Sequence, residues 1–147
     1  MSHRLVGTWT LLSYDSIRAD GSTGKPFGEA VGRLTYDELG HMSGQVMRPD
    51  RLPISRPDDG IRNLRAAYAG YIAYFGTYEV DPARSTVVHH VHGALNPAWV
   101  GGHQVRRMRF DGDLLILEAD VERPEGVLRH VLTWRRLTDQ AQERESP

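Results

Sequence analysis

Three histidines stand close together in the segment Thr86–Ala94, at positions 89, 90 and 92. Alternate residues of an extended strand share a face, so His90 and His92 point one way and His89 the other. Two imidazoles at this spacing are about 7 Å apart and close enough to share a metal ion. The residues that offer a third ligand are His41, His103, Glu79 and Glu118. Spacing marks none of them, so we expect no metal and no cofactor, and a hydrogen-bonded or exposed histidine pair is the preferred interpretation.

The same strand offers acid–base chemistry, because a neutral histidine beside a phenol or a guanidinium moves protons near pH 7. In this hypothesis His89 or His90 moves the proton, and Tyr78 or Tyr74 donates. Arg106 would hold an enolate or carboxylate by two parallel hydrogen bonds. The alternative for Arg106 is a structural ion pair with Glu79 or Glu118 on a neighbouring strand, a routine arrangement in sheets. The candidate catalytic residues are His89, His90, Tyr78 and Arg106.

A second group of residues has the composition of a ligand pocket, mostly apolar with a few polar anchors. The loop that begins at Asn96-Pro97 carries one large aromatic residue, Trp99. Either Trp99 overhangs a pocket while Asn96 binds a ligand oxygen, or Trp99 is a hydrophobic plug and Asn96 starts a turn. The candidate ligand-binding residues are Tyr74, Met42, Gln45, Met47, Asn96, Trp99, Met108 and Trp134.

Composition excludes several classes of function. The chain has 147 residues, no cysteine and a net charge of −1, which leaves no thiol chemistry and no electrostatic footprint for nucleic acid. It contains no phosphate-binding glycine loop, nucleophile elbow, zinc-protease helix or dinucleotide fingerprint. No signal peptide or membrane-spanning stretch is recognisable, so we expect a cytoplasmic protein without a membrane partner. A homodimer is left open.

Turn signals divide the chain into about eight short strands, which favours an antiparallel sandwich or barrel. Asp111-Gly112, for example, predicts a tight hairpin. Residues 1–138 form the predicted domain, followed by a polar tail at 139–147. The predicted strands are Gly7–Ile17, Val31–Tyr36, His41–Arg48, Gly76–Val80, Thr86–Ala94, Gln104–Phe110, Leu114–Val121 and Val127–Leu137.

One insertion interrupts this pattern between the third and fourth strands. Apolar residues from Ile61 to Phe75 recur at helical spacing, after a loop that contains three prolines. Asp58 or Asp59 would cap this helix, and the helix would cover one end of the barrel or pack on its outside. Arg48, where the loop begins, is expected to pair with Asp50, Asp58 or Asp59.

Few of the predicted strands have a clean apolar face opposite a clean polar one. On the strand of Gln104–Phe110, for example, Arg106 shares a face with Met108 and Phe110. About eight strands can close around one small ligand, so a barrel with a partly polar cavity explains the mixed faces. Misassigned strand registers are the alternative explanation.

The chain resembles the bacterial and fungal lipocalin-like domain family from Leu5 to Leu137. The resemblance rests on Gly7-Thr8-Trp9, on the run Tyr71–Val80, on Asn96–Gly101 and on Leu132-Thr133-Trp134. It implies an antiparallel calycin-type barrel in which Trp9 packs under an arginine of the last strand, here Arg135 or Arg136. Some similar small barrels act as cyclases or isomerases in biosynthetic pathways.

These observations support three hypotheses about function. In the first, the barrel binds a small, largely apolar molecule that carries an oxygen. In the second, the same cavity is the active site of a cofactor-free cyclase or isomerase for a polyketide- or terpenoid-like intermediate. In the third, the barrel has no ligand and associates with itself through a sheet edge.

Overall fold

The computed structural model describes residues 4–54 and 60–139. It is built almost entirely from antiparallel strands, joined mostly by tight turns. The strands are β1 (Gly7–Ile17), β2 (Thr23–Gly24), β3 (Val31–Tyr36), β4 (His41–Met47), β5 (Tyr71–Asp81), β6 (Thr86–Ala94), β7 (His103–Asp111), β8 (Leu114–Arg123) and β9 (Gly126–Arg136). The helices are α1 (Ile61–Ala69) and the short 3-10 helix η2 (Pro97–Trp99).

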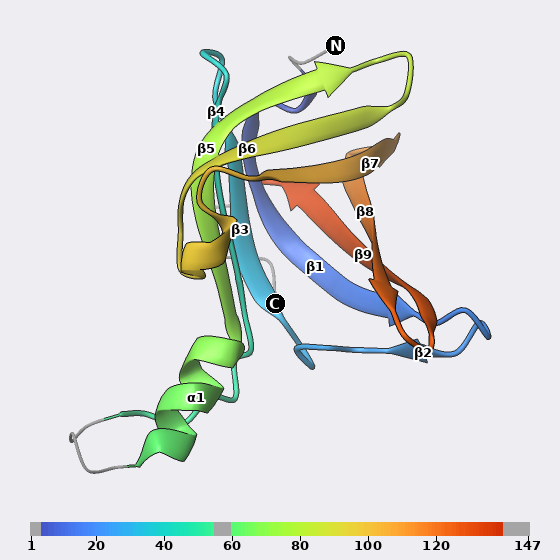
Figure 1. Ribbon diagram of the computed structural model, residues 1–147. Coiled ribbons are helices and arrows are strands. Elements are labelled where there is room, and N and C mark those ends of the chain that lie inside the picture. The colour runs from blue at the N-terminus through green and yellow to red at the C-terminus, as the bar shows by residue number, and fades with distance from the viewer. Residues whose placement is uncertain (1–3, 55–59, 140–147) are drawn as a thin grey trace.

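The eight long strands form one closed barrel (Figure 1). β1 pairs with β3, each later strand pairs with the next, and β9 pairs back with β1. The two-residue strand β2 pairs with the far end of β1. The predicted all-β, calycin-like barrel with one helix inserted after its third long strand is therefore confirmed.

The turn residues explain the hairpins. Asp37 Oδ1 accepts hydrogen bonds from the backbone N–H groups of Leu39 and His41, which fixes the turn between β3 and β4. In the turn between β7 and β8, Gly112 has φ 61°, a conformation that costs glycine little.

The predicted extent of the helix is wrong at its C-terminal end. α1 ends at Ala69, followed by Gly70, and residues 71–75 belong to β5, where they pair with β4. Apolar residues at Tyr71, Ile72 and Phe75 fit helical spacing, but the ladder to β4 satisfies their backbone groups in extended form. The predicted caps Asp58 and Asp59, and residues 140–147 of the predicted tail, lie outside the described residues.

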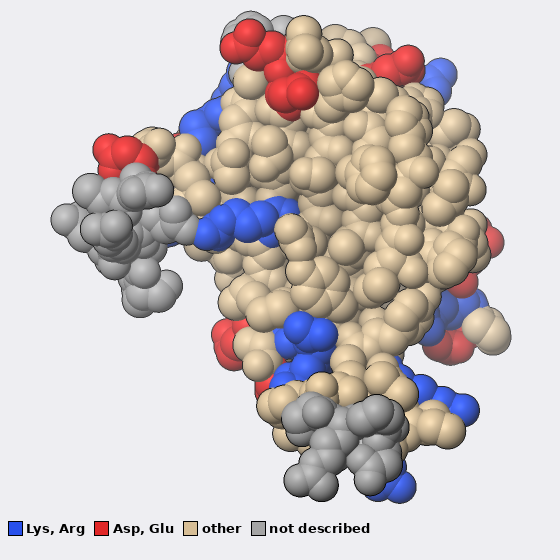
Figure 2. Space-filling model, turned by 90° about the vertical axis from the view of Figure 1, so that its left-hand side faces the viewer, with Lys and Arg blue, Asp and Glu red and all other residues tan. Residues whose placement is uncertain are grey.

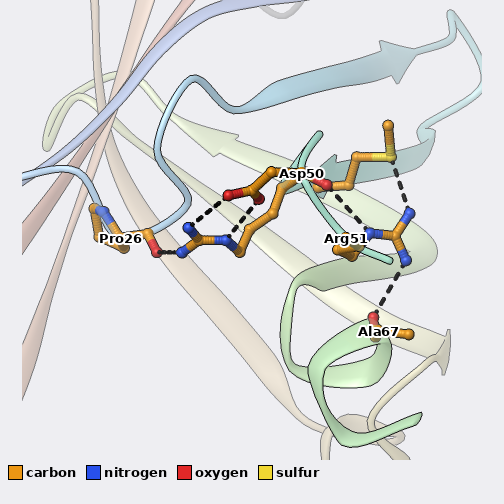
Figure 3. Close-up of polar contacts among 6 residues, drawn as sticks. Pro26, Asp50, Arg51 and Ala67 are labelled. Carbon is orange, nitrogen blue, oxygen red and sulfur yellow. Dashed lines mark hydrogen bonds and ion pairs between the residues drawn. The ribbon is translucent and has the colours of Figure 1, made fainter. Parts of the chain in front are cut away.

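Two arginines hold the segment between β4 and α1 in place (Figure 3). Arg48 forms the predicted ion pair with Asp50 (Nε–Oδ1 3.1 Å) and donates to the carbonyl of Pro26. Arg51 donates to the carbonyls of Arg48 and Ala67. None of the α1 side chains is buried, so α1 lies on the outside of the barrel and does not cover one of its ends. Within the described part of the chain, no helix has the length and apolarity needed to cross a bilayer.

One end of the barrel is plugged. The Trp9 ring is 1% exposed, its Nε1–H donates to the carbonyl of Leu5, and the Arg136 guanidinium lies 4.3 Å from its centroid. Arg136 also donates to the carbonyls of Arg4 and Val6, which ties the last strand to the start of the chain. Of the two arginines that the resemblance offered, Arg136 stacks on Trp9, and the expected packing is confirmed.

The barrel wall is open between parts of β7 and β8. β7 pairs with β8 only between the pairs Arg107–Glu118 and Asp111–Leu114. Residues 103–106 of β7 pair with β6, and residues 119–123 of β8 pair with β9, so the two strands diverge. We call the resulting gap the lateral opening, because residues from both of its sides line the cavity described below.

Candidate functional site

A cavity of about 480 Å³ lies inside the barrel and reaches the lateral opening. Its size falls within the range of small-molecule pockets. The apolar side chains of its lining are Leu34, Val46, Ile72, Val105, Leu117, Ala119, Val121 and Leu132. The main polar and aromatic groups are Tyr14, Tyr74, His89, Trp99, Arg106, His130 and Trp134. The wall is thus largely apolar, with polar groups supplied from β1, β5, β6, β7 and β9.

His89 is a deeply buried polar group of this cavity: it is 2% exposed and held between two phenols. Its Nε2 lies 2.6 Å from the Tyr36 hydroxyl and its Nδ1 lies 2.6 Å from the Tyr74 hydroxyl. Burial, reinforced by the nearby Arg106 charge, lowers the pKa of His89 to about 3. Burial raises the pKa of both tyrosines. We call the hydrogen-bonded residues Tyr36, His89 and Tyr74 the buried chain. At neutral pH the buried chain therefore consists of a neutral imidazole and two protonated phenols.

Arg106 brings a positive charge to the cavity wall. It donates to the Gln104 side-chain oxygen (3.1 Å) and to the carbonyl of Val105 (3.0 Å). Within residues 4–54 and 60–139 no carboxylate forms an ion pair with it, so the expected alternative of a pair with Glu79 or Glu118 is wrong. Its charge lowers the pKa of His89 and acts on Tyr74 as well, which places it near the buried chain.

A second phenol–imidazole pair lies across the cavity. The Tyr14 hydroxyl is 2.7 Å from His130 Nδ1. Burial lowers the pKa of His130, with Arg123 and Arg106 adding to the effect, and burial raises the pKa of Tyr14. This pair is also uncharged at neutral pH.

Two tryptophans border the same space. Trp99, carried on η2, packs edge-on against the Tyr74 ring at 6.0 Å between centroids. Trp134 is 3% exposed, and its Nε1–H is buried without a hydrogen-bond partner. A buried, unsatisfied donor is costly, so a ligand acceptor at this position would be favourable.

An ion cluster holds the rim of the lateral opening. The Asp120 carboxylate accepts two hydrogen bonds from Arg107, both 3.1 Å, and lies 3.5 Å from Arg129. The hydrogen bond from Arg107 lowers the pKa of Asp120. Asp120 lines the cavity, but its charge is already paired.

Half of the predicted site residues line this cavity. His89, Tyr74 and Arg106 come together around its polar part. Gln45 reaches its rim, where its side-chain oxygen accepts a hydrogen bond from the Tyr71 hydroxyl. Trp99 and Trp134 complete the group. Their roles in binding or catalysis stay predictions.

The other predicted site residues lie elsewhere. Tyr78 donates to the carbonyl of Asp37 and packs in the core. Met42 is buried in that core, and Met108 packs against it. Met47 contacts Arg51 through its sulfur (3.2 Å). Asn96 caps η2, since its Oδ1 accepts from the backbone N–H of Ala98, so the turn-forming interpretation describes it.

The fourth predicted catalytic residue, His90, does not line the cavity. Its Nδ1 lies 2.8 Å from Nδ1 of His103, on the neighbouring strand β7, and its Nε2 lies 3.6 Å from a Glu79 carboxylate oxygen. The register between β5 and β6 shifts at Phe75/Gly76, so the expected alternation of His90 and His92 along β6 is interrupted. Among the described residues, no three histidine or acidic side chains are placed to hold a metal ion.

Tyr14, Tyr36 and His130 were not among the predicted site residues. His130 shares a face with Leu132 and Trp134 on β9, so alternation could have found it. Tyr36 likewise alternates with Leu34. Tyr14 carries no such signal, because the register between β1 and β9 shifts between Leu11 and Ser13.

Comparison with known proteins agrees with this architecture. Residues 6–137 match the model of the lipocalin-like domain. The chain belongs to this family. A relative from Aspergillus oryzae (strain ATCC 42149 / RIB 40) is named 4'-hydroxy-3'-methoxypropiophenone carrier protein ppsC. It is 35% identical over 112 residues, which cover 65% of this chain and 96% of the relative. The sequence similarity therefore extends over nearly the whole length of the relative.

Proposed function

We propose that this lipocalin-like protein binds a small, largely apolar, oxygen-bearing molecule in its barrel cavity. The observation that carries the proposal is the cavity of about 480 Å³, apolar in most of its wall and supplied with hydrogen-bonding groups from Tyr74, Arg106 and Trp134. The carrier name of the fungal relative adds support, because the aryl ketone in that name has an apolar ring and oxygen acceptors.

The electrostatics favour binding over catalysis. A general base is most effective when its pKa lies near the working pH. The pKa of His89 is about 3, which makes its imidazole a poor proton acceptor at pH 7. The raised pKa of Tyr74 makes its phenol a poor acid as well. We therefore rank the cyclase or isomerase hypothesis second.

Self-association through an edge ranks third. Pairing of β1 with β9 closes the sheet, which leaves the short β2 and the divergent stretches beside the lateral opening as edges in the described chain. On the side of β4, β5 and η2 the surface is largely uncharged, with charged side chains mainly at its margins (Figure 2). A stable dimer by size-exclusion chromatography, without any ligand binding, would favour this third hypothesis.

The test is a titration with two probes. N-Phenyl-1-naphthylamine, a neutral fluorophore, should brighten on binding, and 4'-hydroxy-3'-methoxypropiophenone should displace it. Ala119 lines the cavity, so Ala119→Phe should reduce binding of both probes because the new ring fills the space. The matched control is Ala83→Phe in the exposed turn between β5 and β6, which should bind as the wild type does. Failure of both probes to bind the folded wild type, or equal binding by Ala119→Phe, would contradict the proposal.

A further inference from the structure

The direction of the hydrogen bonds in the buried chain follows from counting protons. Tyr36, neutral His89 and Tyr74 carry one exchangeable proton each, three in all, and form two hydrogen bonds with one another. One proton is therefore left over. Its position depends on which imidazole nitrogen carries the hydrogen.

Tyr36 decides this position. Its side chain is 1% exposed, and His89 Nε2 is the single hydrogen-bond partner of its hydroxyl within the described chain. If Nε2 carried the hydrogen, the Tyr36 O–H would be buried without an acceptor, which is costly. Tyr36 therefore donates to Nε2, and the hydrogen of His89 lies on Nδ1.

The surplus proton then belongs to Tyr74. His89 Nδ1–H donates to the Tyr74 oxygen, so the Tyr74 hydroxyl hydrogen is free to point elsewhere. Tyr74 lines the cavity, whereas Tyr36 does not. The buried chain thus presents a donor to whatever occupies the cavity.

Two other groups of the cavity wall are donors as well. Trp134 Nε1–H is buried and unpartnered. The Arg106 guanidinium donates hydrogen bonds to two neutral oxygens and is paired with no carboxylate in the described chain. The cavity carboxylate of Asp120 is already held by Arg107 and Arg129, so it leaves the Arg106 charge uncompensated.

We propose that the cavity selects an organic anion: an apolar body with an ionised oxygen, such as a carboxylate, an enolate or an acidic phenol, that accepts hydrogen bonds from Tyr74 and Arg106. This inference rests on the proposed function and deepens it by naming the class of ligand. Tyr36 and His89 act as positioning residues, because their hydrogen bonds orient the Tyr74 hydroxyl while neither residue donates to the ligand itself.

The first test reads the proton positions directly. In a long-range ¹H–¹⁵N spectrum of the wild-type protein at pH 7, His89 should show a pyrrole-type Nδ1 and a pyridine-type Nε2. The opposite assignment would remove the Tyr74 donor and overturn this part of the proposal.

The second test compares two fluorophores that differ by one charged group. 8-Anilinonaphthalene-1-sulfonate is N-phenyl-1-naphthylamine with an added sulfonate. The anion should bind the wild type more tightly than the neutral probe. Arg106→Gln should weaken binding of the anion by about tenfold to a hundredfold, the effect of losing a charged hydrogen bond, and should weaken binding of the neutral probe far less.

Two variants sharpen the comparison. Tyr74→Phe should also weaken the anion selectively, by about fivefold to tenfold. Arg109→Gln is the matched control, because Arg109 lies on the exposed face of the same strand as Arg106 and should leave both probes unaffected. The anion should also shift the indole N–H signal of Trp134 but not that of Trp9, which is bonded to Leu5.

The outcomes separate this inference from the function on which it rests. Tight binding of the neutral probe with weaker binding of the anion, or an anion affinity that Arg106→Gln does not change, would overturn the anion proposal and leave the binding function standing. Failure of both fluorophores to bind the folded wild type would overturn both.

Discussion

Acidification should destabilise this barrel well before its carboxylates titrate, because His89 is buried in its neutral form. The unfolded chain has an ordinary histidine pKa of about 6.5, whereas the native pKa is about 3. Between these values the unfolded state binds a proton that the native state rejects, so stability is complete above pH 6.5 and falls as the pH falls. The difference at pH 5 amounts to about 2 kcal/mol relative to pH 8.

Urea unfolding at pH 8, 6 and 5, followed by tryptophan fluorescence, measures this loss. His89→Gln is the comparison, because an amide keeps hydrogen-bonding capacity and does not titrate. This variant should start less stable and should lose about 2 kcal/mol less than the wild type between pH 8 and pH 5. His130, whose pKa is also lowered by burial, adds a loss of the same sign to both proteins, and the comparison cancels it.

Two results would refute this reasoning. One is an equal loss of stability in the wild type and His89→Gln over this pH range. The other is an NMR titration of the wild type in which the His89 ring gains a proton near pH 6.5, which would show that the imidazole is not buried as described.

Further predictions concern the elements that hold the cavity in shape, each measured by urea unfolding. Gly76→Ala should cost more than 3 kcal/mol or abolish folding, because its Cβ would lie 1.8 Å from a backbone carbonyl of β6, whereas Gly112→Ala, with open space around it, should cost about 1 kcal/mol. Leu115→Ala should cost about 2–5 kcal/mol, since its side chain is fully buried, whereas Leu39→Ala at an exposed turn should cost less than about 0.5 kcal/mol. Arg136→Met should cost about 1–3 kcal/mol through the lost stacking on the plugging indole and the lost backbone hydrogen bonds, and an unchanged stability would argue against that plug.

The sequence predicted the order of strands well because turns are local. Asp37 and Gly112 act through their own neighbours, so their effect is visible without the fold. The end of α1 was missed because Tyr71 and Phe75 fit both helical and strand spacing, and pairing with β4 decided between them.

The site was predicted unevenly for a similar reason. His89 and Arg106 were recognised by their chemistry, and both line the cavity. His90 was grouped with them because a sequence does not reveal the register shift between β5 and β6. Tyr36, which orients the whole buried chain, comes from a strand 53 positions away from His89, and this contact exists only after the barrel closes.

The packing of Trp9 under Arg136 affects how a ligand would enter and leave the cavity. Because Trp9 and Arg136 fill one end of the barrel, a molecule bound in the cavity could not leave through it. If the proposed binding function holds, exchange of the ligand would depend on the divergence of β7 and β8 rather than on movement of Trp9.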